Sequence, residues 1–327
     1  MVGSQPGQIA PTQDLERAIA AVVRECLAVR RGEDVLVICN PATREIGERL
    51  RAEAQAAGAD AVLAVMSERA SHAEEPPDSL AAAMLKADVV LAPTVQSLSH
   101  TAARSAATEA GVRIATLPGV TTEMLARVMS ADMEELRRRG RAIADTLTRG
   151  REAMITCPNG SDLRLGLEGR TAIADDGRLI ERGAFGNLPC GEGFIAPVEG
   201  TSEGRLVVDG TIATVGLPAK PVTLAVERGY LVQANGKEGA RLMELLTAHG
   251  VEGTNVAELG IGTNEKAILS GNVLEDEKIL GTVHVAFGAS AAIGGTIQVP
   301  VHLDCVVTKP SVSVDGEPVV RDGALLL

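Results

Sequence analysis

The order of apolar segments in the first 150 residues is the feature that most restricts the fold. Apolar runs typical of strands occupy residues 34–39, 61–66, 87–92 and 112–116. Segments with helical spacing occupy residues 12–29, 42–57, 80–85 and 101–110. Strands that alternate with helices in this way form parallel sheets with helices on both faces. We therefore predict an α/β N-terminal domain over residues 1–150, with a Rossmann-like parallel sheet.

No phosphate-binding motif accompanies the predicted sheet. Cys39-Asn40-Pro41 follows the first strand, where a dinucleotide-binding protein would have GxGxxG, and no Walker A sequence occurs. The resemblance to a Rossmann domain is therefore one of architecture only. The highly charged residues 131–149 predict a solvated helix that links this domain to the rest of the chain.

Turn signals dominate the chain after residue 150. Asn-Gly, Asp-Gly and Arg-Gly pairs between apolar runs, which favour hairpins, occur at residues 159–160, 176–177, 209–210, 228–229 and 315–316. Residues 237–249 alone have clear helical spacing. We predict that residues 151–327 form a β-rich domain of mostly antiparallel strands that binds metal, because every strong candidate ligand lies in it.

Composition excludes several classes of protein. The 327-residue chain has a formal net charge of −12 and only four aromatic residues, one Tyr and three Phe. Nucleic-acid binding needs a basic face and often aromatic platforms, so we expect no nucleic-acid partner. No run of about 18 apolar residues predicts a membrane span. The polar start Met1–Gln8 lacks the pattern of a signal peptide. Five scattered cysteines without CxxC spacing are typical of reduced thiols, so we expect a cytoplasmic protein.

Two histidine segments in the second half carry candidate metal ligands. His302-Leu303-Asp304 ends residues 296–304, which are rich in β-branched residues and predict a strand. Side chains two positions apart on a strand project from the same face, so this imidazole and carboxylate are presented together. His284 lies on another predicted strand, residues 281–288. Each pattern alone is common, and a single histidine of this kind is more often a core residue than a ligand.

Two carboxylates add to these candidates. Glu192 and Glu258 each lie in a Gly-rich apolar stretch, where an ionised side chain is costly to bury unless it is paired or bound to a metal. Either acid alone could equally be a solvated loop residue. Together with the histidine segments they give three carboxylates and two imidazoles, a set that suits two divalent ions such as Zn, Mn or Co. This predicts a metal-dependent hydrolase that acts on a small peptide or amide through metal-activated water.

Two further residues are candidates for catalysis. Glu199 is a candidate base that would polarise the metal-bound water. His100 follows a predicted strand end, the usual place of functional groups in open α/β sheets, and could hold substrate or carry a proton. The alternatives are a hairpin-edge acid for Glu199 and a helix-start histidine without such a role for His100.

The same residues carry a family resemblance. Residues 187–197 (NLPCGEGFIAP), 257–264 (AELGIGTN) and the two histidine segments resemble, in order, four motifs of the aminopeptidase T/aminopeptidase S family of metallopeptidases. The match covers most of residues 150–327. The resemblance implies two metal ions held by five residues, namely Glu192, Glu258, His284, His302 and Asp304. It also implies an α/β part followed by a β-rich part, and a homodimer.

Two departures favour a second branch of the same superfamily. The chain is shorter than these peptidases, and it has Ala291 where many carry an active-site Tyr seven residues after the first histidine. The shorter branch is similar to 2,5-dihydroxypyridine dioxygenase, which holds one Fe(II) through two histidines and a carboxylate. His302 and Asp304 match two of those ligands, and the remaining histidine falls where this chain has Glu258. The alternative prediction is therefore a mononuclear Fe(II) dioxygenase for a hydroxylated heteroaromatic.

Overall fold

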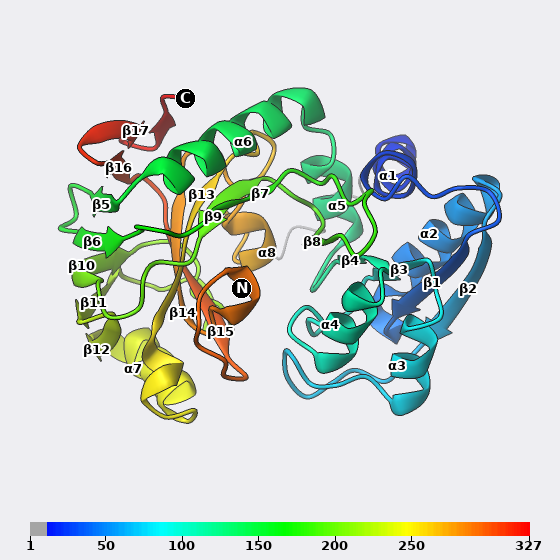
Figure 1. Cartoon of the computed structure of the whole chain (residues 1–327), viewed down its shortest axis with the longest axis horizontal. Helices are drawn as coiled ribbons and strands as arrows, with labels where there is room; N and C mark the ends of the chain where they lie inside the picture. Colours follow the sequence, from blue (N-terminus) through cyan, green and yellow to red (C-terminus); the bar gives the residue numbers. More distant parts are fainter. Residues whose placement is uncertain (1–11) are drawn as a thin grey trace, which may run out of the picture. The chain divides into compact units, whose positions relative to one another are not determined.

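The chain divides into two units whose boundaries are not simple in sequence (Figure 1). The computed structural model describes residues 12–327, and the polar start Met1–Gln8 lies outside the described residues. Among the described residues, the first unit comprises residues 12–131 together with residues 177–190. The second comprises residues 132–176 and 191–327. The predicted boundary at residue 150 falls inside the second unit, because helix α6 (Met133–Arg149) packs against two strands of that unit.

Five parallel strands form the sheet of the first unit. In spatial order they are β2 (Asp60–Val65), β1 (Asp34–Cys39), β3 (Val89–Ala92), β4 (Arg113–Thr116) and β8 (Phe185–Asn187). The predicted α/β architecture with a parallel sheet is confirmed, and the four predicted strands begin and end within two residues of those observed. The fifth strand, β8, was not predicted, and it comes from the separate segment 177–190.

Helices cover both faces of this sheet. They are α1 (Thr12–Ala20), which continues as a π-helix over Ala21–Cys26, α2 (Arg44–Ala56) after a 3₁₀ turn over Pro41–Thr43, α3 (Asp78–Met84), α4 (Ala102–Glu109) and α5 (Thr122–Val128). Alternate residues of β1 separate the two layers. Leu36 and Ile38 join the apolar cluster under α3 and α4, whereas Cys39 contacts Gly47 of α2 on the opposite face.

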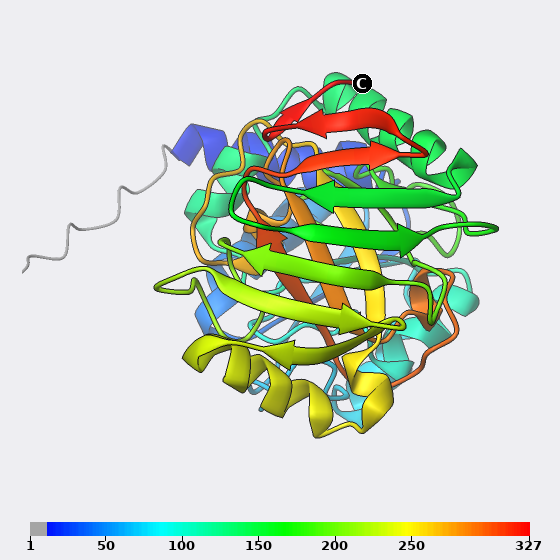
Figure 2. The same cartoon turned by 90° about the vertical axis from the view of Figure 1, so that its left-hand side faces the viewer.

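Two antiparallel sheets build the second unit. Sheet B has eight strands in the order β12 (Tyr230–Ala234), β11 (Val222–Glu227), β10 (Glu203–Val208), β6 (Asp162–Gly166), β5 (Glu152–Thr156), β16 (Ser311–Val314), β17 (Glu317–Arg321) and β18 (Ala324–Leu325). Sheet C has five strands in the order β15 (His302–Val307), β14 (Val283–Gly288), β13 (Val256–Gly262), β9 (Glu192–Ile195) and β7 (Ile173–Asp175). Figure 2 shows the strands of sheet B running across those of sheet C behind them. The predicted antiparallel β-rich part is confirmed.

The second unit has few helices. Besides α6, they are α7 (Gly236–Thr247), α8 (Val273–Asp276) and 3₁₀ turns over Val251–Thr254 and Ala291–Ile293. The Asp132 side chain caps α6 by accepting hydrogen bonds from the amides of Glu134 and Glu135. Helix α7, predicted over residues 237–249, packs beside β11 and β12.

Three of the five predicted hairpin turns connect adjacent strands by short turns. Asp315-Gly316, with φ of 51° and 87°, forms the turn between β16 and β17. Positive φ at both central residues is the requirement of a type I′ hairpin, which favours Asp-Gly. The pair at residues 176–177 does not form a hairpin, because the chain leaves there for the first unit and β7 pairs instead with β9. The pair at residues 209–210 begins a longer loop that connects β10 to its neighbour β11.

Apolar side chains from both sheets form the core of the second unit. On sheet C they alternate with polar ones, so that Leu259, Val285 and Phe287 are fully buried against sheet B. Within residues 12–327 none of the five cysteines forms a disulfide, and no helix is long and apolar enough to cross a membrane. The face of sheet C that packs on sheet B is thus apolar, and the polar side chains of the sheet project from its opposite face.

Truncation of Leu259 tests how firmly that apolar face holds the sheet. We expect Leu259→Ala to lower the free energy of unfolding by about 2–5 kcal/mol, because it removes buried methyl groups and leaves a cavity. Leu217→Ala, at a site that is 51% exposed, is the control and should change it by less than about 0.5 kcal/mol. Urea denaturation measures both, and equal effects would contradict the two-layer packing described here.

Candidate metal centre

The register of sheet C brings His302, Asp304 and Glu258 to one face. Directly opposed residues of neighbouring antiparallel strands project from the same side. Asp304 lies opposite Ala286, and Ala286 lies opposite Glu258. His302, two residues before Asp304, lies opposite Gly288 and shares this face. The small side chains on the central strand leave the space between the ligands open.

The remaining two predicted ligands lie on the same face. His284 is opposite Gly260, two residues along β13 from Glu258. Glu192 is opposite Gly262, at the start of β9. All five residues predicted as metal ligands therefore converge on the polar face of sheet C. Three of their cross-strand neighbours, Gly260, Gly262 and Gly288, are glycines, so the ligand side chains have room on this face.

The strand that carries His302 is shorter than predicted at its beginning. The sequence predicts a strand over residues 296–304, whereas β15 begins at His302. Pro300 has no amide hydrogen to donate to a ladder, and residues 296–301 instead form irregular contacts, such as the hydrogen bond from the Ala289 amide to the Val301 carbonyl (2.8 Å). The prediction that His302 and Asp304 share a face is confirmed.

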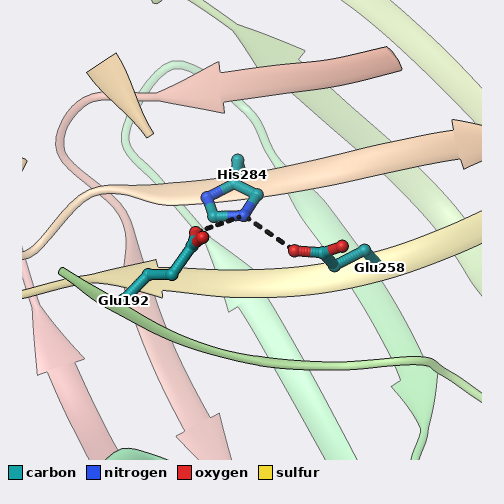
Figure 3. Close-up of side chains that lie close together, drawn as sticks. All are labelled: Glu192, Glu258 and His284. Carbon is teal, nitrogen blue, oxygen red and sulfur yellow. Dashed lines mark hydrogen bonds and ion pairs between the residues drawn. The ribbon is translucent and has the colours of Figure 1, made fainter. Parts of the chain in front are cut away.

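One group of possible ligands consists of Glu192, Glu258 and His284 (Figure 3). His284 Nε2 lies 3.1 Å from Glu192 Oε2 and 3.1 Å from Glu258 Oε1, so the ring nitrogen points between the two carboxylates. All three side chains are buried, and His284 is 1% exposed. Glu192 Oε2 and His284 Nδ1 are buried atoms that make no hydrogen bond.

A second group consists of Glu258, His302 and Asp304. His302 Nε2 lies 3.3 Å from Glu258 Oε2 and 3.6 Å from Asp304 Oδ1. His302 Nδ1 donates to the Ala289 carbonyl (2.8 Å), which leaves Nε2 to face the carboxylates. The His302 and Asp304 side chains are 10% and 15% exposed, so this group is the more accessible one. Glu258 belongs to both groups, with one carboxylate oxygen turned to each histidine.

The close approach of His284 to the backbone requires a glycine on the next strand. A Cβ atom added at Gly260 would lie 2.0 Å from His284 Nε2, far inside van der Waals contact. Because His284 is enclosed on all sides, the ring could not move aside without leaving its two carboxylates. Gly260 is therefore part of the geometry of the site, although it offers no ligand atom.

Lys278 is a member of this cluster that the sequence did not indicate. It follows α8 in the charged run Glu275-Asp276-Glu277-Lys278, which is typical of a solvated surface segment. Its side chain is nevertheless fully buried, with Nζ 2.6 Å from Glu192 Oε1 and 2.5 Å from Glu277 Oε1. The one sequence signal is its place five residues before the first residue of β14, the apolar strand that carries His284.

The charges of the cluster set its protonation. Burial acts to lower the pKa of His284, but the Glu192 and Glu258 carboxylates outweigh it and raise that pKa well above 6.5. Asp304 and Glu258 raise the pKa of His302 in the same way. Burial acts to raise the pKa of Glu258, and the two histidines lower it to about 2. Metal-free, the cluster therefore holds ionised carboxylates and protonated imidazoles, which a divalent cation can replace.

The donor set fits a divalent metal ion. Carboxylate oxygens and imidazole nitrogens bind Fe, Mn, Co and Zn alike. Each group brings its ligand atoms within 4.8 Å of one another. An ion bound to either group would replace a proton that now lies between an imidazole and its carboxylates.

The two predicted catalytic residues have different surroundings. Glu199 is partly buried in the second unit, where it forms an ion pair with Arg170 and accepts a hydrogen bond from the Thr296 amide (2.7 Å). Burial acts to raise the pKa of Glu199, but backbone hydrogen bonds and Arg170 lower it. A carboxylate so held is a weak base, and its visible role is to fix the loop before β15. His100 belongs to the first unit and is exposed in the turn between β3 and α4.

Comparison with known proteins identifies the family. The family model described as NicX, 2,5-dihydroxypyridine 5,6-dioxygenase, matches residues 14–327. The chain belongs to this dioxygenase family. A curated relative, the 2,5-dihydroxypyridine 5,6-dioxygenase of Pseudomonas putida KT2440, is 25% identical over 217 residues. That alignment covers 62% of this chain and 61% of the relative's length.

Solved structures share the fold over nearly the whole chain. The 2,5-dihydroxypyridine dioxygenase of Pseudomonas putida KT2440 matches with a TM-score of 0.85 and 20% identity, over 97% of this chain and 98% of that one. AmpT from Thermus thermophilus matches with a TM-score of 0.72 and 18% identity, over 97% of this chain and 100% of that one. At identities of 20% and 18%, the likeness shows that this member of the dioxygenase family shares the fold of both proteins.

The prediction of an aminopeptidase-like hydrolase is wrong. The family model and the curated relative both indicate a dioxygenase, which was the alternative prediction. The relation to aminopeptidase T holds at the level of the fold. The prediction was based on the number and type of the five ligand residues, and these do not distinguish a hydrolase from a dioxygenase. Ala291, which is exposed and offers no hydroxyl group, was the better signal.

Gly260→Ala tests the fit of His284 in this dioxygenase family member. We expect the added methyl group to displace the ring and to weaken metal binding by about 10–100-fold, as loss of a residue that supports a ligand does. Gly140→Ala in α6 is the control, since an added Cβ there would have no atom nearer than 3.6 Å. Titration of each metal-free variant with Mn²⁺ measures the affinity, and unchanged affinity in Gly260→Ala would contradict the assignment.

The raised histidine pKa values predict that metal binding releases protons. Between pH 6.5 and the raised pKa of His302, the metal-free site holds a proton that the ion must displace. Affinity should therefore fall by about tenfold for each unit by which pH is lowered in this window, for each proton released. Calorimetric titration with Mn²⁺ in two buffers of different ionisation enthalpy measures the proton count, and a count of zero at pH 7 would contradict this.

Proposed function

We propose that this chain is an Fe(II)-dependent ring-cleaving dioxygenase that acts on a hydroxylated N-heteroaromatic such as a dihydroxypyridine. The family match over residues 14–327 is the observation that carries the proposal. The group of Glu258, His302 and Asp304 supports it, because these three residues could hold one Fe(II) ion, which would have further positions for substrate and O₂. The curated relative is a 2,5-dihydroxypyridine 5,6-dioxygenase, which suggests the substrate class.

The accessible group is the better candidate for the iron ligands. His302 and Asp304 are 10% and 15% exposed in their side chains, whereas His284 and Glu192 are enclosed in the protein. A ring substrate has to reach the ion, so ligands at the edge of the buried cluster suit catalysis. When bound there, Fe(II) would supply the redox chemistry that combines O₂ with the ring.

The chain's own residues would set the properties of that site. His302 donates from Nδ1 to the Ala289 carbonyl, which holds its Nε2 toward Glu258 and Asp304. Glu258 is oriented from its other side by His284. With two carboxylates and one imidazole, the ligand set carries a charge of −2, one more negative than a set of two histidines and one carboxylate. A more negative set stabilises the higher oxidation state of a metal.

His284 has a role that does not require contact with an ion. Its Nε2 lies between Glu192 Oε2 and Glu258 Oε1 at equal distances, so a positive charge on the ring lies close to both carboxylates. Because its ring is enclosed, a proton on Nε2 is shielded from solvent. His284 thus positions Glu258 and can hold or return one proton within the site.

Oxygen consumption by the iron-loaded protein tests the proposed function. Protein purified anaerobically and loaded with Fe(II) should consume one O₂ for each 2,5-dihydroxypyridine lost, followed with an oxygen electrode and by ultraviolet absorption. Asp304→Ala should lower iron occupancy and turnover by about 100-fold or more, because a ligand is removed. Glu317→Gln, at an exposed position of β17, is the control and should change neither.

Two results would count against the proposal in different ways. Fully iron-loaded protein that consumes no O₂ with any dihydroxypyridine isomer would contradict the proposed reaction. An Asp304→Ala variant that keeps its iron would leave the reaction standing and would contradict the choice of ligands.

A further inference from the structure

Lys278 places a positive charge inside the carboxylate cluster. Its Nζ contacts Glu192 Oε1 at 2.6 Å and Glu277 Oε1 at 2.5 Å, and it lies 3.8 Å from Asp175 Oδ2. Lys278 is among the largest fully buried side chains of residues 12–327. A lysine is rarely buried without a specific partner, because its ammonium group is strongly hydrated in water.

The ammonium group cannot leave this position easily. The Lys278 carbonyl accepts a hydrogen bond from the Asn264 amide (2.8 Å), and its amide donates to the Glu275 carbonyl (2.9 Å). The next residue, Ile279, forms a bridge with Asn264. The backbone is thus held on both sides of the residue, and the side chain has no exposed surface toward which it could turn.

The two groups of possible ligands are affected differently. Glu192 belongs only to the buried group, and one of its two oxygens is already bound to the ammonium group. An ion in that group would share the Glu192 carboxylate with the lysine, at a distance where two cations repel each other strongly. The accessible group of Glu258, His302 and Asp304 has no contact with Lys278 among the interactions described.

We propose that Lys278 takes the place of a second metal ion and thereby restricts the cluster to one ion, held by Glu258, His302 and Asp304. The inference rests on the proposed function in its choice of ligands. Lys278 supplies the positive charge that Glu192 needs, in a form that neither exchanges nor takes part in redox chemistry. The cluster of five ligand-type residues then serves a mononuclear enzyme, and Lys278 determines its metal stoichiometry.

The test measures the number of metal ions bound per chain in the absence of substrate. Metal-free wild-type protein is titrated with Mn²⁺ and, separately, with Co²⁺, and bound metal is measured by mass spectrometry after desalting. We expect one ion per chain in the wild type and two in Lys278→Met, which keeps most of the length of the side chain and removes its charge. Lys309→Met, at an exposed position, is the matched control and should keep one ion.

Two further variants protect the test against a folding defect. Lys278→Met leaves Glu192 and Glu277 without their cation, so its fold is checked by circular dichroism with and without metal. Glu192→Gln, in protein that retains Lys278, should still bind one ion, because Glu192 forms an ion pair with the lysine and does not bind the metal. The double variant Lys278→Met/Glu192→Gln should return from two ions to one.

Three outcomes would overturn the inference. They are two ions per chain in the wild type, a single ion in folded Lys278→Met, and loss of the ion in Glu192→Gln. If Lys278→Met does not fold, the wild type and Glu192→Gln still decide. None of these measurements uses substrate or O₂, so iron-loaded protein that fails to consume O₂ would contradict the proposed function and leave this count unaffected.

Discussion

Sheet C has apolar side chains on one face and charged side chains on the other, and the whole metal centre depends on that division. Leu303, between His302 and Asp304, is buried against sheet B, as are Leu259 and Val285 on the neighbouring strands. A shift of pairing by one residue would turn these apolar side chains outward and the ligands into the core. The free energy of core packing thus fixes the face from which each ligand side chain projects. No further interaction is needed to bring the ligands to the same face.

The charged face is stable because its charges are mutually arranged. Burial alone would neutralise Glu258 and both histidines, yet each is held in its ionised form by the others. Glu258 is central, since it contacts His284 through one oxygen and His302 through the other. A cluster of this kind is destabilised when one partner is removed, because the remaining charges stay buried without compensation.

Sequence patterns predicted the periodic parts of the molecule and the ligand residues, for physical reasons that also explain the failures. A continuous apolar run predicts strands such as β1, whereas the three residues of β8 are only half-buried and have no such pattern. The burial of Lys278 was not predicted, because a run of four charged residues is normally exposed to water. The reaction class was misjudged because His, Glu and Asp bind the metals of hydrolases and oxygenases alike, and identity of ligands does not specify chemistry.

The passage of the chain out of the second unit and back has a consequence for how the protein can be taken apart. Residues 177–190 leave from the end of β7 and return at the start of β9, and in between they add β8 to the parallel sheet. A fragment that stops at residue 131 would lack the strand that covers the edge of β4. On the ribosome, the first sheet can be completed only after β5, β6 and β7 have been synthesised. The α/β unit is therefore not an exchangeable module, and fusion or domain-swap designs have to treat the chain as a whole.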